Sequence, residues 1–155
     1  MTQFETGFTM DTSSIKFGPG ITRELGFEMD RLGCHRVMLV TDERVAKLPP
    51  VAVAAESLRA AEIDFAIYDR SRVEPTDSSF RDAIEFAVDG NFDGFVAVGG
   101  GSSIDTAKAA NLYATYPADL LEYVNAPIGK GTPLPGALKP LIAVPTTAGT
   151  GSETT

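Results

Sequence analysis

The chain changes abruptly from an apolar run, residues 95–98, to three glycines, Gly99, Gly100 and Gly101. The residues from Ser103 onward have the pattern of a helix. Glycine has no Cβ, so the chain can turn tightly here and a ligand can approach the backbone closely. The first N–H groups of a helix lack partners within the helix and favour an anion. The junction therefore predicts a phosphate-binding turn, although a plain tight turn between strand and helix fits the same residues.

A second loop of the same kind, residues 145–151, is rich in glycine and threonine and follows another apolar run, residues 141–144. It is either a second wall of a ligand site or a plain connector. The stretch after it has the composition of a first helical turn, with Thr150 and Glu153 at capping-box spacing. We therefore expect the chain to be a piece of a longer polypeptide.

Short apolar runs alternate with helical patterns along the chain. The expected strands are residues 14–17 at a sheet edge, 37–40, 65–68, 95–98 and 141–144. The expected helices are residues 21–32, 49–61, 80–88, 103–114 and 119–124, and residues 126–140 form a loop stiffened by proline. Continuous apolar runs are typical of strands buried on both faces. This alternation predicts an α/β fold, a Rossmann-like parallel sheet with helices on both faces, as one domain of residues 1–155.

Three segments lie just past predicted strand ends: Asp42, the glycine triplet and residues 146–151. Ligands of open parallel sheets bind at the carboxyl ends of the strands, so these segments are expected to share one crevice. Asp42 can hold the ribose hydroxyls of a nucleotide, or it can cap the following turn. Asp105 and Lys108 lie three residues apart on one helix face, where they either pair with each other or contact the ligand.

The composition excludes several classes of function. The net charge is −8, and the lysines and arginines are scattered, which disfavours nucleic acid and anionic membranes as partners. The only cysteine is Cys34 and the only histidine is His35, so a site with several His or Cys ligands cannot form within the chain. We expect both residues to be structural. Because the first residues lack the features of a signal or transit peptide, we predict a cytoplasmic location.

Two segments, GGGSSIDTAK at residues 99–108 and PTTAGTGSE at residues 145–153, resemble the signatures of the iron-containing (group III) alcohol dehydrogenases. Residues 47–51, 73–80, 108–113 and 126–131 look most like the hydroxyacid–oxoacid transhydrogenase branch of that family. The resemblance covers nearly the whole chain. It implies a nucleotide-binding α/β domain followed by an all-helical domain.

The resemblance also implies which residues bind the cofactor. The pyrophosphate would lie on the glycine-triplet loop, Asp42 would contact the adenosine ribose and favour NAD over NADP, and threonines of the second loop would line the site. With Asp105 included, the candidate cofactor-binding residues are Asp42, Gly99, Gly100, Gly101, Ser102, Ser103, Asp105, Thr146, Thr147 and Thr150. No catalytic residue and no metal ligand is expected in this chain, because the family holds its iron or zinc with an aspartate and three histidines of the helical domain.

The expected parent protein is an oxidoreductase that transfers hydride between a hydroxyacid, such as 4-hydroxybutyrate, and an oxoacid, such as 2-oxoglutarate. This chain alone would bind nucleotide at most. The alternatives are an NAD-dependent alcohol dehydrogenase acting on an alcohol and an aldehyde, a lyase resembling dehydroquinate synthase, and a non-catalytic nucleotide-binding module. The segment 146–153 argues against the lyase. Apart from small-molecule substrates, we expect self-association into a homo-oligomer through an open sheet edge.

Overall fold

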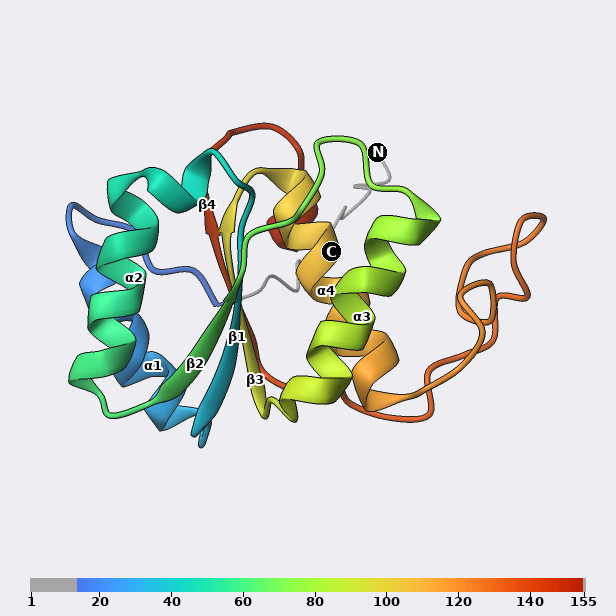
Figure 1. Cartoon of the computed structure of the whole chain (residues 1–155), viewed down its shortest axis with the longest axis horizontal. Coiled ribbons are helices and arrows are strands. Elements are labelled where there is room, and N and C mark those ends of the chain that lie inside the picture. The colour runs from blue at the N-terminus through green and yellow to red at the C-terminus, as the bar shows by residue number, and fades with distance from the viewer. Residues whose placement is uncertain (1–13, 155) are drawn as a thin grey trace, which may run out of the picture.

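The computed structural model describes residues 14–154, which form one parallel sheet with helices on both faces (Figure 1). The strands are β1 (Arg36–Val40), β2 (Asp64–Tyr68), β3 (Gly94–Gly99) and β4 (Leu141–Pro145). The α-helices are α1 (Leu25–Arg31), α2 (Pro49–Ala60), α3 (Asp77–Gly90) and α4 (Gly101–Thr115), and short 3-10 turns are η1 (Ile21–Glu24), η2 (Val45–Lys47) and η3 (Ser152–Thr154). The predicted fold class is confirmed.

The strands are arranged in the order β2-β1-β3-β4, and every neighbouring pair is parallel. The chain runs from β1 outward to β2 on one side and from β3 outward to β4 on the other. The order therefore reverses between β1 and β3. In open α/β sheets such a switch point leaves a crevice at the carboxyl ends of the two strands.

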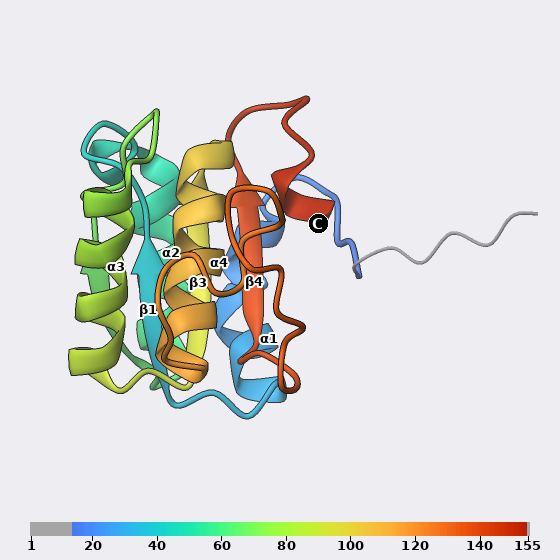
Figure 2. The same cartoon turned by 90° about the vertical axis from the view of Figure 1, so that its right-hand side faces the viewer.

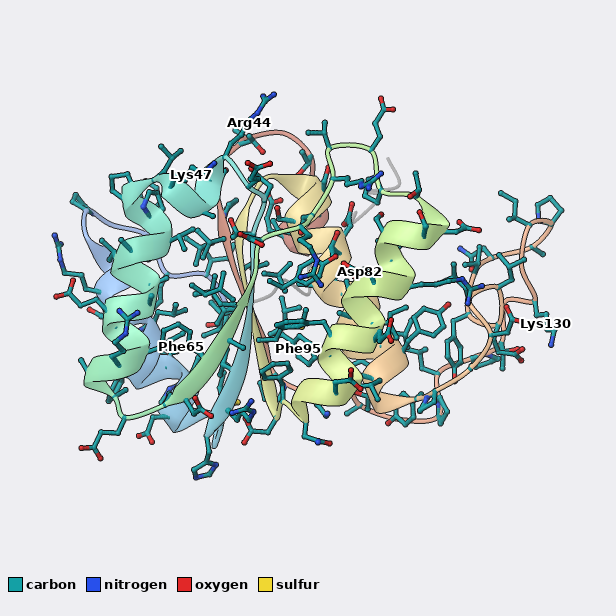
Figure 3. All side chains as sticks on the ribbon, viewed as in Figure 1. Arg44, Lys47, Phe65, Asp82, Phe95 and Lys130 are labelled. Atoms are coloured by element: carbon teal, nitrogen blue, oxygen red, sulfur yellow. The ribbon has the colours of Figure 1, made fainter. Side chains whose placement is uncertain are left out.

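Two apolar clusters, one on each face of the sheet, hold the layers together. Helices α1 and α2 cover one face and α3 and α4 cover the other, and Figure 3 shows Phe65 on the α2 side and Phe95 on the α3 side. Every residue of β3 is buried, whereas β4 is only half-buried and pairs with β3 alone among residues 14–154. Figure 2 shows the sheet from the side of α3 and α4, with β4 at its right-hand edge.

The helix boundaries follow local chemistry. Helix α2 begins at the proline pair, as predicted, because proline fits the first turn. Helix α3 begins after Thr76, whose side chain accepts a hydrogen bond from the Ser79 amide, and it ends at Asn91 in the left-handed conformation. Helix α4 begins at Gly101 rather than Ser103. Gly100 is its N-cap with extended backbone, so Gly101 belongs to the first turn.

Two predicted elements are wrong. Residues 14–17 have no strand partner and form no strand, and Phe17 is 98% exposed. Residues 119–124 form turns instead of a helix, because their carbonyl oxygens accept hydrogen bonds from residues 130–132 of the returning loop. Residues 126–140 form the predicted loop, and the whole connection 116–140 projects from the body beyond α4 (Figure 1). No helix within residues 14–154 has the length and apolar character needed to cross a membrane.

Candidate functional site

The candidate site lies at the switch point, where β1, β3 and β4 end at the same edge of the sheet. Asp42 follows β1, the glycine triplet closes β3 and opens α4, and residues 146–151 follow β4. Figure 3 shows Arg44, just beyond Asp42, at this edge. The structure brings the three predicted segments together, because parallel strands with neighbouring registers end side by side.

The glycine triplet is packed between Asp42 and the second loop. A Cβ on Gly99 would meet Ser103 Oγ at 2.6 Å and lie 3.9 Å from Asp42 Oδ2. A Cβ on Gly100 would lie 3.2 Å from Thr147 Oγ1, and a Cβ on Gly101 would lie 3.0 Å from Thr150 Cβ. Side chains at these positions would fill the space between the loops, which is why glycine is required here.

The start of α4 presents free backbone donors to this edge. The Gly100 carbonyl accepts from the amides of Ser103 (3.0 Å) and Ile104 (3.2 Å), and Gly100 offers no side-chain cap. The amides of Gly101 and Ser102 have no such partner within the described part of the chain. These N–H groups, with the positive end of a 15-residue helix behind them, are suited to bind an anion.

Asp42 takes the capping role, one of the two roles that the sequence left open, and its role toward a ribose stays a prediction. Its Oδ1 accepts hydrogen bonds from the amides of Arg44 (2.9 Å) and Val45 (3.0 Å), and so caps the turn that leads into η2. Its Oδ2 lies on the side of Gly99, 3.9 Å from where a Cβ on that residue would be. The cap fixes the orientation of the carboxylate and leaves Oδ2 without a hydrogen-bond partner among residues 14–154.

The second loop is tied to the first by hydrogen bonds. The Thr146 amide donates to the Gly99 carbonyl (2.9 Å), and Lys108 Nζ donates to the Ser152 carbonyl (2.5 Å). Gly149 and Gly151 take positive φ angles of 98° and 71°, which let the loop fold back over α4. The exposed side chains of Thr146, Thr147 and Thr150 remain at the edge of the sheet.

The remaining candidates take different positions on α4. Ser103 is 2% exposed and its side chain fills the space beneath Gly99, so it supports the loop from inside. Ser102 Oγ donates to the Val73 carbonyl (2.6 Å) and joins α4 to the β2–α3 connection. Asp105 is exposed one turn into the helix. The Ser102–Val73 contact was missed from the sequence, since nothing in either residue signals a partner 29 positions away.

A buried hydroxyl beside this edge was also not predicted from the sequence. Ser71 follows β2, and its amide donates to the Thr41 carbonyl (3.2 Å), next to Asp42. Its Oγ has no hydrogen-bond partner among residues 14–154, and the residue is only 8% exposed. A buried polar atom without a partner is uncommon and is suited to hold water or ligand.

Cys34 lies in the core, whereas the His35 side chain is exposed and its backbone amide takes part in the contact at the start of β1. Cys34 is buried and its Sγ donates weakly to the Asp93 carbonyl (3.7 Å), while burial raises the pKa of the thiol. The Asp93 carboxylate accepts from the amides of His35 (2.9 Å) and Arg36 (2.8 Å), which fixes the entry to β1. Residues 14–154 contain no group of three or more His, Cys, Asp or Glu side chains that could hold a metal ion.

Known proteins are similar to this chain over nearly its whole length. The human mitochondrial hydroxyacid-oxoacid transhydrogenase is 59% identical over 149 residues, which cover 96% of this chain and 32% of that protein. A 1,3-propanediol oxidoreductase superposes with a TM-score of 0.84 at 33% identity, over 97% of this chain and 38% of the other. The NADH-dependent butanol dehydrogenase A of Thermotoga maritima superposes equally well, at 0.84 and 25% identity, over 96% and 36% of the two chains.

These comparisons correct the predicted location and show what share of its relatives' length the chain matches. The human transhydrogenase is named as mitochondrial, which contradicts the cytoplasmic prediction; that prediction rested on the composition of the first residues alone. The chain spans about a third of the length of the curated relatives that it matches. Residues 12–155 match the family of iron-containing alcohol dehydrogenases over most of the sequence. The chain therefore belongs to the iron-containing alcohol dehydrogenase family.

Proposed function

We propose that the crevice at the switch point binds NAD. The pyrophosphate would accept hydrogen bonds from the backbone amides at the start of α4. It could approach them closely because Gly100 and Gly101 have no Cβ. The free Oδ2 of Asp42 would accept a ribose hydroxyl. Thr146, Thr147 and Thr150 would line the opposite wall, and Ser102 and Ser103 would hold the loop in place.

The convergence of three loops at the switch point carries this proposal. A glycine-rich turn alone is also compatible with a simple connector. Here a Cβ at Gly100 would contact the second loop, and one at Gly99 would lie within 3.9 Å of the Asp42 carboxylate. The three segments thus bring amide donors, hydroxyl groups and a carboxylate together at one edge of the sheet. This donor set fits a pyrophosphate joined to a ribose.

For the whole protein we propose an oxidoreductase that transfers hydride between a hydroxyacid and an oxoacid. The proposal follows from the relatives named as transhydrogenases, and an NAD-linked alcohol dehydrogenase is the alternative that the solved structures favour. A bound nicotinamide supplies the hydride acceptor and donor. The residues of this chain bind and orient the cofactor, and none of them is assigned a proton-transfer step.

A divalent metal, iron or zinc, is proposed only for the complete protein, because the side chains of residues 14–154 do not gather into a metal site. Small hydroxyacids or alcohols are the proposed substrates. Self-association into a homo-oligomer stays a prediction, with β4 as the exposed edge.

The test is calorimetric titration of the chain with NAD and with NADP. Gly100→Asp would place a carboxylate where the pyrophosphate lies and should abolish binding. Gly18→Asp is the matched control, because a Cβ on Gly18 meets nothing within 4 Å. Asp42→Asn should weaken NAD binding and narrow the preference for NAD over NADP. NAD affinity that survives Gly100→Asp in a folded chain would overturn the assignment.

A further inference from the structure

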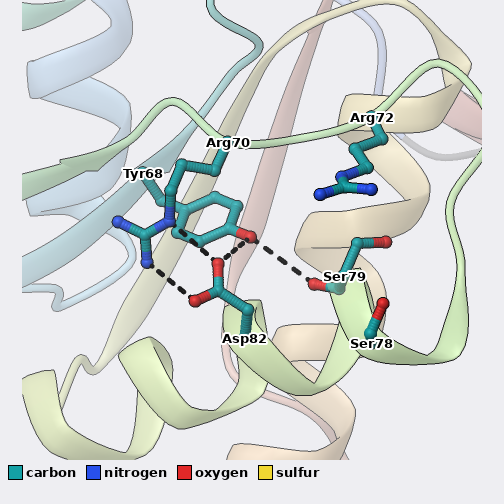
Figure 4. Close-up of a pocket in the computed structure, with 6 residues that line it drawn as sticks. All are labelled: Tyr68, Arg70, Arg72, Ser78, Ser79 and Asp82. Atoms are coloured by element: carbon teal, nitrogen blue, oxygen red, sulfur yellow. Dashed lines mark hydrogen bonds and ion pairs between the residues drawn. The ribbon is translucent and has the colours of Figure 1, made fainter.

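A second polar cavity lies at the carboxyl end of β2, beside the first turns of α3 (Figure 4). Its volume is about 300 Å³. The residues that line it are Tyr68, Arg70, Arg72, Ser78, Ser79 and Asp82. Two of these, Tyr68 and Ser79, are at least nine-tenths buried and give the cavity a fixed wall.

One of the two arginines is already neutralised. Arg70 Nε and Nη2 donate to the two carboxylate oxygens of Asp82 at 2.9 and 3.2 Å, and Tyr68 Oη donates to Asp82 Oδ2 at 2.8 Å. The Arg70 guanidinium also lies 4.7 Å from the centre of the Tyr68 ring. The hydrogen bonds from Arg70 and Tyr68, with a smaller effect of the Arg72 charge, hold the pKa of Asp82 below its usual range, so the carboxylate is ionised.

The other arginine has no such partner. In Figure 4 the Arg72 guanidinium points into the cavity from the β2–α3 connection, opposite Arg70. No hydrogen bond or ion pair joins Arg72 to another residue in the range 14–154, and Asp82 is already paired. With two guanidinium groups and one carboxylate, the cavity carries a net charge of one positive unit.

We propose that this cavity binds an oxyanion, a carboxylate or phosphate group, through Arg72. The planar guanidinium offers paired donors that match two oxygens of such a group. The Ser78 hydroxyl is within the same cavity, and α3 directs its positive end toward it. The Arg70–Asp82–Tyr68 cluster fixes the opposite wall of the cavity.

The cavity is separate from the glycine loop but connected to it. Ser102 Oγ holds the Val73 carbonyl at 2.6 Å, immediately after Arg72. The proposal does not depend on nucleotide binding, since none of the cavity residues belongs to the candidate NAD site.

The test is residue-resolved NMR of the chain, titrated separately with inorganic phosphate and with acetate, and with sodium chloride at matched ionic strength. Saturable shifts of the Arg72, Ser78 and Ser79 amides are expected with phosphate, acetate or both, and the comparison identifies the favoured group. Arg72→Gln should weaken this binding at least about tenfold, because a charge-assisted contact is lost. Arg81→Gln, an exposed change on α3, should leave it unaltered.

Arg72→Lys provides a second variant, which retains the charge but lacks the planar pair of donors. It should bind the anion more weakly than the unsubstituted chain does. The proposal is overturned if chloride reproduces the shifts, or if they fail to saturate or are unchanged in Arg72→Gln. Shifts confined to Gly101 and Ser102 would also overturn it, and would place phosphate at the glycine loop alone. Failure here leaves the NAD titration unaffected, because the two sites report through different amides.

Discussion

Replacing Gly99 with alanine should destabilise the fold through one defined contact. The new Cβ would lie 2.6 Å from Ser103 Oγ and 2.8 Å from Ser103 Cβ. Both residues are buried, and Ser103 is fixed in the first turn of α4 by the hydrogen bond from its amide to the Gly100 carbonyl. The contact can be relieved only by moving that turn away from β3. Such overpacking costs about 1–3 kcal/mol.

A double-mutant cycle isolates this contact. Ser103→Gly removes both clashing atoms, at a cost of about 1 kcal/mol for glycine in a helix. The double variant should therefore be more stable than the sum of the single changes predicts, by about 1–2 kcal/mol. Urea unfolding followed by far-UV circular dichroism measures all four chains. A single Gly99→Ala cost below about 0.5 kcal/mol, or additive effects, would refute the steric reasoning. Gly18→Ala, in open space, is the control.

Three further changes test other parts of the fold. Ser57→Ala removes the hydroxyl that accepts from the Gly26 amide at 2.9 Å, and should cost about 1–3 kcal/mol in urea unfolding; an unchanged midpoint would contradict the pairing of α1 with α2. Thr76→Ala removes the α3 cap and should cost about 1 kcal/mol, seen as a lower thermal midpoint, with Thr76→Ser as the conservative control. Arg70 lowers the pKa of Asp82 in the folded state. The ionised carboxylate therefore adds to the free energy of unfolding at pH values above its unfolded pKa, and this stabilisation is lost as the pH falls through its folded pKa. Because the pair is half-exposed, this amounts to less than about 1 kcal/mol, and Asp82→Asn should flatten the acid limb of the stability–pH curve below about pH 4.

Continuous apolar runs made the four strands predictable. Residues 37–40 and 95–98 are buried on both faces, and such runs have few alternatives in an α/β chain. The segment 14–17 shows the limit of the method. Alternating polarity describes a strand with one buried face, but it says nothing about whether a neighbouring strand exists to pair with it. Phe17 is exposed because residues 14–154 provide no such neighbour.

The segment 119–124 failed for a different reason. Its apolar spacing fits a short helix, but six residues gain little from helical propagation. The hydrogen bonds from the amides of Lys130, Gly131 and Thr132 to residues 121, 124 and 122 instead bind it to a distant part of the loop. The local sequence of residues 119–124 does not reveal that residues 130–132 will hydrogen-bond to it.

The candidate site was predictable as far as strand ends could be located. Asp42 and Gly100 lie at one edge because the strands are parallel, which the alternation of elements predicts, and because β1 lies beside β3, which only the structure shows. The cavity around Arg72 was not predictable. It depends on which arginine Asp82 pairs with, and Arg70 and Arg72 are equally placed in the sequence to be that partner.

The long connection before β4 has a consequence for the order in which the sheet opens. Pairing of β3 with β4 closes the stretch 116–140, which contains no helix or strand, and the entropy lost on closing a loop grows with its length. β4 also has one paired edge and half-buried side chains. Under native conditions its amides should therefore exchange with solvent faster than those of β1 and β3, through local opening that leaves the other three strands folded. Residues 146–151 would unfold together with β4. One wall of the crevice would therefore unfold and refold while Asp42 and the glycine triplet keep their positions.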